Sequence, residues 1–176
     1  MKFRETAIFT GHVFQVPERI QRIDTDNTHG WQLRYGDEPT EFFADGTSDG
    51  SGAGGALDEA TTELHKRIRR LPAPNGLKTE VATWKRSGLP LGISQQAKPR
   101  KKGGVLCYYF QVSVPVVGGA STTKKVYIGT ANTISEERIT EKLAEALAMR
   151  EKSVTLFETA KTREKRAAAR LAQTAR

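Results

Sequence analysis

The sequence LCYYFQVSV, residues 106–114, decides the fold of the second half of this chain. Its apolar residues Phe110, Val112 and Val114 alternate with Tyr109, Gln111 and Ser113. Apolar side chains that recur at every second position are typical of a β-strand with one buried face. The stretch therefore predicts a strand whose polar side chains face away from the core.

Two shorter strands flank this one in the sequence. Residues 92–96 (GISQQ) precede it across a basic turn at residues 98–104, and residues 124–128 (KKVYI) follow a Gly-containing loop at residues 115–123. Apolar runs separated by short connections with Gly are typical of antiparallel hairpins. We therefore expect a three-stranded antiparallel sheet.

A helix follows the three strands. Ser135 is a suitable N-cap residue, and Glu136 and Glu137 place negative charge in the first turn. Apolar residues then recur at helical spacing, at Ile139, Leu143, Ala146 and Leu147. Because no Gly or Pro occurs between Ser135 and Arg176, we expect a long basic helix. We expect its end to fray beyond Phe157, where alanines and arginines replace the apolar stripe.

The first half of the chain gives the same order of elements. Candidate strands lie at residues 6–16, 31–35 and 40–43, and Leu57, Ala60, Leu64 and Ile68 mark an amphipathic helix at residues 56–70. Pro72 and Pro74 end this helix, and the segment after it is typical of a linker. Because a three-stranded sheet needs a helix on one face to be stable, each unit leaves its other sheet face free.

We therefore predict an α+β fold with two tandem units, each a three-stranded antiparallel sheet plus a helix. The first unit covers residues 1–71, a linker covers 72–90, the second unit covers 91–153 and a basic helical tail covers 154–176. The single cysteine, Cys107, excludes a disulfide framework and a Cys-based structural zinc site.

The net positive charge of the chain comes from its second half. The 176 residues contain 28 Lys+Arg and 20 Asp+Glu, which gives a formal net charge of +8. Residues 1–90 hold 12 basic and 13 acidic side chains, a net of −1, whereas residues 91–176 hold 16 and 7, a net of +9. This asymmetry indicates a polyanion partner for the second half. The alternative is a solvated surface whose charge serves solubility.

The polar face of the second sheet is the candidate binding surface. It carries Tyr109, Gln111, Ser113, Lys125 and Tyr127, with Ser94 and Gln96 on the neighbouring strand. The major groove of B-form DNA, about 12 Å wide, admits a β-ribbon. There a glutamine amide matches adenine, a lysine reaches guanine or phosphate, and a tyrosine stacks or contacts the sugar.

Basic residues beside this face extend the candidate site. Lys98, Arg100, Lys101 and Lys102 are predicted phosphate anchors, and Lys124 belongs to the same candidate set. The alternative is an ordinary solvated sheet face beside a basic loop.

Several short motifs resemble a known DNA-binding family. Val126-Tyr127-Ile128-Gly129-Thr130, with Gly92-Ile93-Ser94, Phe110-Gln111-Val112-Ser113 and an Ala-rich helix, resembles the APETALA2/ethylene-response-factor-type domain. In that family a three-stranded sheet backed by a helix reads the major groove. The first unit, with Arg22-Ile23-Asp24, His29-Gly30-Trp31-Gln32-Leu33-Arg34 and Phe42-Phe43-Ala44-Asp45, resembles bacterial and phage relatives of the domain. The resemblance covers roughly residues 18–70 and 91–153.

The resemblance implies a set of DNA-contacting residues. By position they are Ser94, Gln96, Gln111, Ser113, Lys125 and Tyr127 in the second unit, and Gln32 and Arg34 in the first. Ser94 and Gln96 stand where the family has arginines on its first strand, and Tyr127 stands where it has a tryptophan. These departures favour contacts with A·T-rich sequence or with the DNA backbone over the guanine-rich recognition of the plant domains.

Other motifs do not indicate an enzyme. Residues 50–55 (GSGAGG) satisfy G-x-G-x-x-G, but a Pro-rich segment follows their helix and the acidic residue of a dinucleotide site is missing at the required distance. His12, His29 and His65 lie in different elements without metal-ligand spacing. Cys107 begins an apolar strand and is interpreted as a small buried residue. We expect no catalysis, no metal, no cofactor and no small-molecule substrate.

The end of the chain is strongly basic. Residues 161–176 hold 6 Lys+Arg against 1 Asp+Glu. The segment is either a basic arm that gains affinity by releasing counterions from DNA or a solvated, partly disordered tail.

We expect the protein to be cytoplasmic and nucleoid-associated, with double-stranded DNA as its partner. We expect a transcriptional regulator or a nucleoid-associated factor. No signal peptide or membrane span is predicted, so no membrane partner is expected. The alternative is a protein-interaction module, such as an adaptor or a phage-encoded inhibitor of a host polymerase. That module would act through the acidic first unit, which is also a candidate surface for self-association. RNA binding is a third hypothesis, although the stacking aromatics typical of single-strand readers are few.

Overall fold

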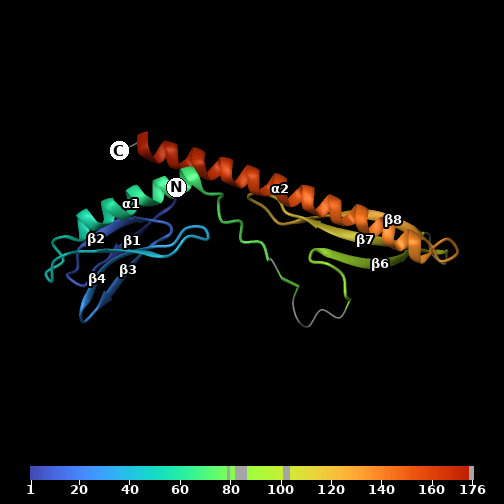
Figure 1. Ribbon diagram of the computed structural model, residues 1–176, viewed down its shortest axis with the longest axis horizontal. Helices are drawn as coiled ribbons and strands as arrows, with labels where there is room; N and C mark the ends of the chain where they lie inside the picture. Colours follow the sequence, from blue (N-terminus) through green and yellow to red (C-terminus); the bar gives the residue numbers. More distant parts are fainter. Residues whose placement is uncertain (79, 82–86, 101–103, 175–176) are drawn as a thin grey trace. The chain divides into compact units, whose positions relative to one another are not determined.

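The computed structural model describes residues 1–78, 80–81, 87–100 and 104–174. These residues form an α+β fold with three antiparallel sheets and two helices (Figure 1). They fall into two compact units: unit 1 is Met1–Pro74 with the described part of Lys161–Arg176, and unit 2 is the described part of Asn75–Ala160. Across these ranges, no helix is both long enough and apolar enough to cross a membrane.

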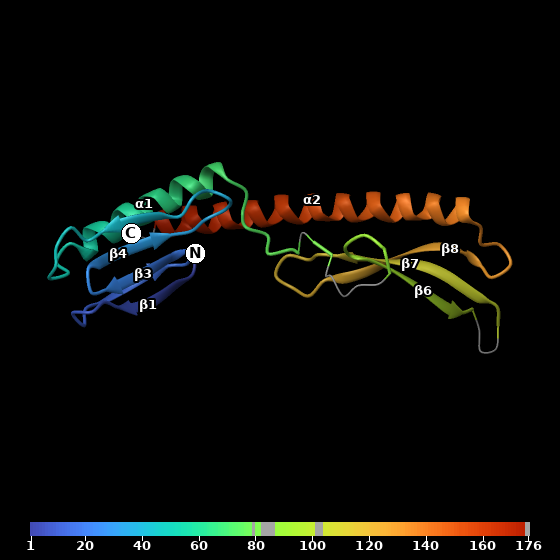
Figure 2. The same cartoon turned by 60° about the horizontal axis from the view of Figure 1, so that its bottom comes forward.

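Unit 1 contains two of the sheets in the described part of the chain. The hairpin β1 (Phe3–Ala7) and β2 (Val13–Pro17) forms one sheet. The second has the order β3-β4-β5, formed by β3 (Ile20–Thr25), β4 (Thr28–Leu33) and β5 (Glu41–Ala44). Helix α1 (Ala53–Arg70) follows β5 and lies along this sheet (Figure 2).

Trp31 anchors the core of unit 1. Its side chain is fully buried, and its indole Nε1 donates a hydrogen bond to the carbonyl of Ala53, the first residue of α1, at 2.8 Å. Leu57, Leu64 and Ile68 lie on one face of α1 and are buried in the same core. Burial of each such side chain stabilises the fold by about 1.5–3 kcal/mol.

The expectation of a single strand at residues 6–16 is wrong. Gly11 adopts φ +87° in the turn that joins β1 to β2, so this segment is a hairpin of its own. The strand that pairs with β4 on the side opposite β5 is β3, which the sequence pattern did not reveal. The fold therefore has three sheets in its described residues, in place of the predicted two.

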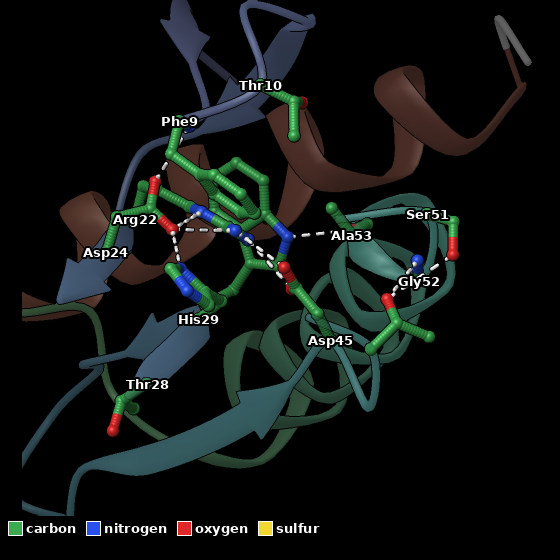
Figure 3. A network of polar contacts seen from close by, with 12 residues as sticks. Phe9, Thr10, Arg22, Asp24, Thr28, His29, Asp45, Ser51, Gly52 and Ala53 are labelled. Carbon is green, nitrogen blue, oxygen red and sulfur yellow. Dashed lines mark hydrogen bonds and ion pairs between the residues drawn. The ribbon is translucent and has the colours of Figure 1, made fainter. Parts of the chain in front are cut away.

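A buried ion pair explains why β3 escapes prediction. Arg22 of β3 has a side chain only 5% exposed, and its Nη2 lies 2.6 Å from Oδ2 of the fully buried Asp45 carboxylate. The guanidinium also lies 4.8 Å from the centre of the Trp31 ring. Figure 3 shows Arg22 between Asp24 and Asp45, with His29 bonded to Asp24. A charged residue at an inward position breaks the apolar alternation from which strands are predicted.

The predicted sheet of the second half is present in unit 2. Its strands are β6 (Ile93–Pro99), β7 (Leu106–Val114) and β8 (Thr122–Thr130), antiparallel in the order β6-β7-β8. Helix α2 (Glu136–Thr174) begins directly after Ser135, whose Oγ accepts a hydrogen bond from the backbone N–H of Arg138 at 3.3 Å. Ser135 thus caps the helix as predicted.

Helix α2 does not fray beyond Phe157, contrary to expectation. It continues to Thr174, and its residues from 161 onward belong to unit 1. There Ala169 is buried in the core, and the Arg166 Nε donates to the Ile68 carbonyl at 3.3 Å. These tertiary contacts therefore stabilise the end of α2, although the apolar stripe of the sequence fades there.

Candidate nucleic-acid interface

One face of the β6-β7-β8 sheet is buried against α2. The buried residues there are Ile93, Phe110, Val112, Val126 and Ile128 of the sheet and Ala146 of the helix. Ile139 and Leu143 of α2, two of the predicted stripe residues, pack against this core, and α2 runs along the sheet (Figure 2). Because successive side chains of a strand point to opposite sides, the residues that alternate with these core positions along each strand face away from the helix.

The strand register brings the predicted outward residues together in rows. Gln111 is paired with Ser94 of β6 and with Lys125 of β8. Tyr109 is paired with Gln96 and with Tyr127. Cross-strand partners have Cβ atoms about 4.5–5.5 Å apart. We call this surface the outward face: Ser94, Gln96, Tyr109, Gln111, Ser113, Lys125 and Tyr127.

The two tyrosines and the lysine of the outward face lie close together. The ring centroids of Tyr109 and Tyr127 are 5.4 Å apart with their planes at 54°, and Lys125 Nζ lies 5.9 Å from the Tyr109 ring centroid. A register shift between Tyr108 and Tyr109 brings Tyr109 opposite Tyr127. The bulge thus aligns two aromatic rings and an ammonium group on one side of the sheet.

Tyr109 and Gln96 are neutral polar groups on this face. Burial and a hydrogen bond with the Cys107 thiol raise the pKa of Tyr109 above its ordinary value, while the nearby Arg100 acts in the opposite direction. The Tyr109 hydroxyl is therefore protonated at neutral pH. The Oε1 of Gln96 is enclosed and has no hydrogen-bond partner among the described residues. Internal contacts thus leave part of the hydrogen-bonding capacity of this amide unused.

Basic side chains flank one end of the outward face. Lys98, near the end of β6, and Arg100, just after it, are both exposed. The Arg100 N–H donates a hydrogen bond to the Val105 carbonyl at 3.1 Å. Lys101 and Lys102, the other predicted phosphate anchors, lie outside the described residues.

Lys124 does not join the outward face. It is exposed, but its cross-strand partner is Val112, a core residue on the side packed against α2. Its neighbour Lys125 lies on the other side, paired with Gln111. Sequence position alone suggested a common role for the two lysines, and strand alternation separates them.

The residues predicted in unit 1 do not form an equivalent surface. Gln32 is half-buried on β4, where it is paired with Gln21 and Phe42. Arg34 is exposed just after β4, and its N–H donates to the Arg19 carbonyl at 2.9 Å. The cross-strand row at Gln32 therefore carries no charged side chain, whereas the matching row of unit 2 contains Lys125.

Thr123 is a further residue on the side of the outward face, and the sequence pattern did not reveal it. It is exposed on β8 opposite Ser113, so it extends the outward face by one hydroxyl group. Thr123 lies two positions before Lys125 and four before Tyr127, so strand alternation places it on the same side of the sheet. The predicted strand began at Lys124, which left Thr123 in the predicted loop.

Hydrogen bonds that involve Gly92 and Arg150 connect the start of β6, the end of β7 and helix α2. Gly92 has φ +77°, and a Cβ on it would lie 2.7 Å from Arg150 Nε. Arg150 of α2 donates from Nη1 to the Ser113 carbonyl, while the Ser113 N–H donates to the Gly92 carbonyl at 2.8 Å. Glycine is favoured here because other residues are strained at this φ, and a Cβ at this position would require the Arg150 side chain to shift.

The outward face combines amide, hydroxyl, aromatic and ammonium groups on a sheet supported from behind. Such groups form directional hydrogen bonds to base edges and charged contacts to phosphates. Among the described residues, no group of three or more His, Cys, Asp or Glu side chains is placed to hold a metal ion. Comparisons of the chain with models of protein families, with curated protein sequences and with solved structures find no match.

Proposed function

We propose that this protein binds double-stranded DNA and that the outward face of β6-β7-β8 enters the major groove. The observation that carries this proposal is the row formed by Ser94, Gln111 and Lys125 across three strands. A sheet that presents polar side chains in a regular row is suited to a groove about 12 Å wide. The cellular role that fits is a transcriptional regulator or a nucleoid-associated protein.

The residues of the outward face have distinct roles in this proposal. Gln111 contributes a donor and an acceptor, the pair that the major-groove edge of adenine matches. Lys125 reaches a guanine edge or a phosphate, and Tyr127, 42% exposed, contacts sugar or base through its ring and hydroxyl. Ser94 and Gln96 occupy the neighbouring strand and extend the contact along the groove.

Electrostatics supports the same partner. Residues 91–176 carry 16 basic and 7 acidic side chains, and exposed Lys98 and Arg100 flank the outward face. Each phosphate neutralised by a basic side chain releases condensed counterions, which favours binding at low salt. This attraction supplies affinity that does not depend on sequence, whereas the outward face supplies the preference among sequences.

The resemblance to the APETALA2/ethylene-response-factor-type domain is part of this proposal. The β-β-β-α order of unit 2 and the position of Gly92 directly before the first strand support it. Because Ser94 and Gln96 stand where that family has arginines, we propose a preference for A·T-rich DNA. Amide side chains pair with adenine more readily than with guanine.

A pair of double variants tests the proposal. Gln111→Ala combined with Lys125→Ala removes two outward residues, and Gln95→Ala combined with Lys124→Ala removes the same residue types from exposed positions that pair with core residues. The first pair is expected to weaken duplex binding by about 1–3 kcal/mol for each good base contact. The second pair is expected to bind nearly as the natural chain does. Fluorescence anisotropy with a labelled duplex measures both.

Two results would contradict the proposal. Equal losses in the two double variants, with both folded, would mean that lysine charge matters and the outward face does not. Unchanged affinity in the outward variant would move the contact elsewhere on the chain. Circular dichroism of each variant establishes that the sheet is intact.

A further inference from the structure

A cationic pocket lies in unit 1, where the end of α1 meets the end of α2. Its volume is about 300 Å³. We call it the arginine pocket, and it is lined by His65, Arg69, Arg166, Ala169, Arg170 and Gln173. Three of these six side chains are guanidinium groups, and none is a carboxylate. A cavity with this lining has the chemistry of an anion site.

The guanidinium groups of the arginine pocket are only partly used by the protein. Arg166 Nε donates to the Ile68 carbonyl at 3.3 Å, and Arg69 Nε donates to the His65 carbonyl at 3.4 Å. Within the described part of the chain, no carboxylate forms an ion pair with Arg69, Arg166 or Arg170. Because a guanidinium has five N–H donors in a planar fork, most of these donors remain for a ligand.

Two other arginines of α1, unlike those of the arginine pocket, form ion pairs with carboxylates. Arg67 Nη2 lies 2.6 Å from a carboxylate oxygen of Glu41, and Arg70 Nη2 lies 2.6 Å from one of Glu38. Unit 1 therefore has carboxylates on the side of α1 that faces β5 and its preceding loop. Like charges that share a cavity repel one another until a counter-anion is present. The arginines of the arginine pocket thus differ from Arg67 and Arg70, because they have no carboxylate partner among the described residues.

We propose that the arginine pocket binds a phosphate group of the DNA backbone and gives unit 1 a sequence-independent contact with nucleic acid. Planar guanidinium forks match phosphate oxygens in a bidentate way, and Gln173 adds a further donor. This inference rests on the proposed DNA binding and adds a second site to it. It assigns a role to the basic end of α2, where Arg166 and Arg170 lie on the side that faces α1.

Two double variants of the full chain, with equal loss of charge, test the arginine pocket. Arg69→Gln with Arg170→Gln removes one arginine from each helix and leaves Arg166 on the Ile68 carbonyl. Lys66→Gln with Arg163→Gln also removes one exposed cation from each helix, at positions that do not line the pocket. Anisotropy with A·T-rich and G·C-rich duplexes, titrated at several salt concentrations, compares the two variants.

The expected result is a loss of about tenfold or more in the pocket variant, by the same factor for both duplexes. The slope of log affinity against log salt should fall by about one, because one phosphate contact is lost. The control variant should bind as the natural chain does. Equal affinities of the two variants would overturn the inference, while a separate loss in the Gln111 and Lys125 variant would leave the proposed function in place.

A second probe separates DNA phosphate from a free phosphate compound. Calorimetric titration with inorganic pyrophosphate measures whether the pocket binds a small anion, with the same two variants as test and control. If the pocket variant loses pyrophosphate binding yet retains full DNA affinity, the backbone contact is overturned and the pocket serves a free phosphate ligand. If the natural chain binds no duplex at all, the proposed function and this contact both fail.

Discussion

Lys124 and Lys125 are adjacent in β8, yet they lie on opposite faces of its sheet. Lys125 is paired with Gln111 on the outward face, and Lys124 is paired with the buried Val112. Both side chains are exposed. The two lysines therefore provide an internal comparison in which residue type, strand and exposure are matched and only the face differs.

Replacing Lys125 by Ala is expected to weaken duplex binding more than replacing Lys124. Loss of a base contact costs about 1–3 kcal/mol, and loss of a phosphate contact lowers the salt slope by about one. Lys124→Ala removes the same charge from the face that packs on α2, so its affinity should stay close to that of the natural chain. Anisotropy titrations measure both, and a larger loss for Lys124→Ala would contradict the assignment of faces.

Replacing Asp45 by Ala is expected to destabilise unit 1 strongly. The Asp45 side chain is fully buried and accepts hydrogen bonds from two nitrogens of Arg22, at 2.8 and 2.6 Å. Its removal leaves a buried guanidinium with Asp24 as its remaining carboxylate partner, and such losses cost about 3–5 kcal/mol. Urea unfolding measures the change. Asp37→Ala, at an exposed position, is the control, and similar small losses in both would contradict a stabilising role for the pair.

The acid sensitivity of unit 1 is expected to depend on Asp24. Burial alone would raise the pKa of this carboxyl, but hydrogen bonds from Arg22 and His29 outweigh burial and hold it below its ordinary value. A lowered pKa in the folded state contributes stability above the unfolded pKa near 4, which is lost as the pH falls through the folded pKa. Unfolding free energies between about pH 2 and pH 6 should therefore fall less steeply for Asp24→Asn. An identical slope in both proteins would contradict the shift.

Gly92→Ala is expected to destabilise unit 2 more than Gly118→Ala. Both glycines have positive φ, +77° and +72°, so both alanines carry a backbone cost of about 1–2 kcal/mol. A Cβ at Gly92 also meets Arg150 Nε at 2.7 Å, whereas nothing lies within 4 Å of one at Gly118. Thermal unfolding separates the two effects. Equal shifts in melting temperature would mean that Arg150 moves aside freely.

The sheet of unit 2 could be predicted because its apolar alternation is uninterrupted. Phe110 and Val112 are buried at every second position of β7, and the predicted bounds of that strand agree with the structure. The outward face follows from the same alternation. The pairing of Tyr109 with Tyr127 could not be predicted in this way. It depends on a register shift, which the apolar alternation of a strand does not indicate.

Features that depend on contacts distant in sequence could not be predicted. Strand β3 was hidden because Arg22 is buried only through its pairing with Asp45. The arginine pocket was hidden because Arg69 and Arg166 come from helices far apart in the chain. The charge of Arg22 suggested exposure, whereas its pairing with Asp45 buries it.

The most direct measurement is anisotropy of the natural full chain with labelled A·T-rich and G·C-rich duplexes across a salt series. Between about 50 and 200 mM salt we expect the affinity to fall steeply. The slope of log affinity against log salt should correspond to several phosphate contacts. We also expect tighter binding to the A·T-rich duplex, since the proposed contacts of the outward face include the amides of Gln96 and Gln111, which match adenine. Absence of binding to either duplex at the lowest salt, or binding that does not change with salt, would contradict DNA recognition by this protein.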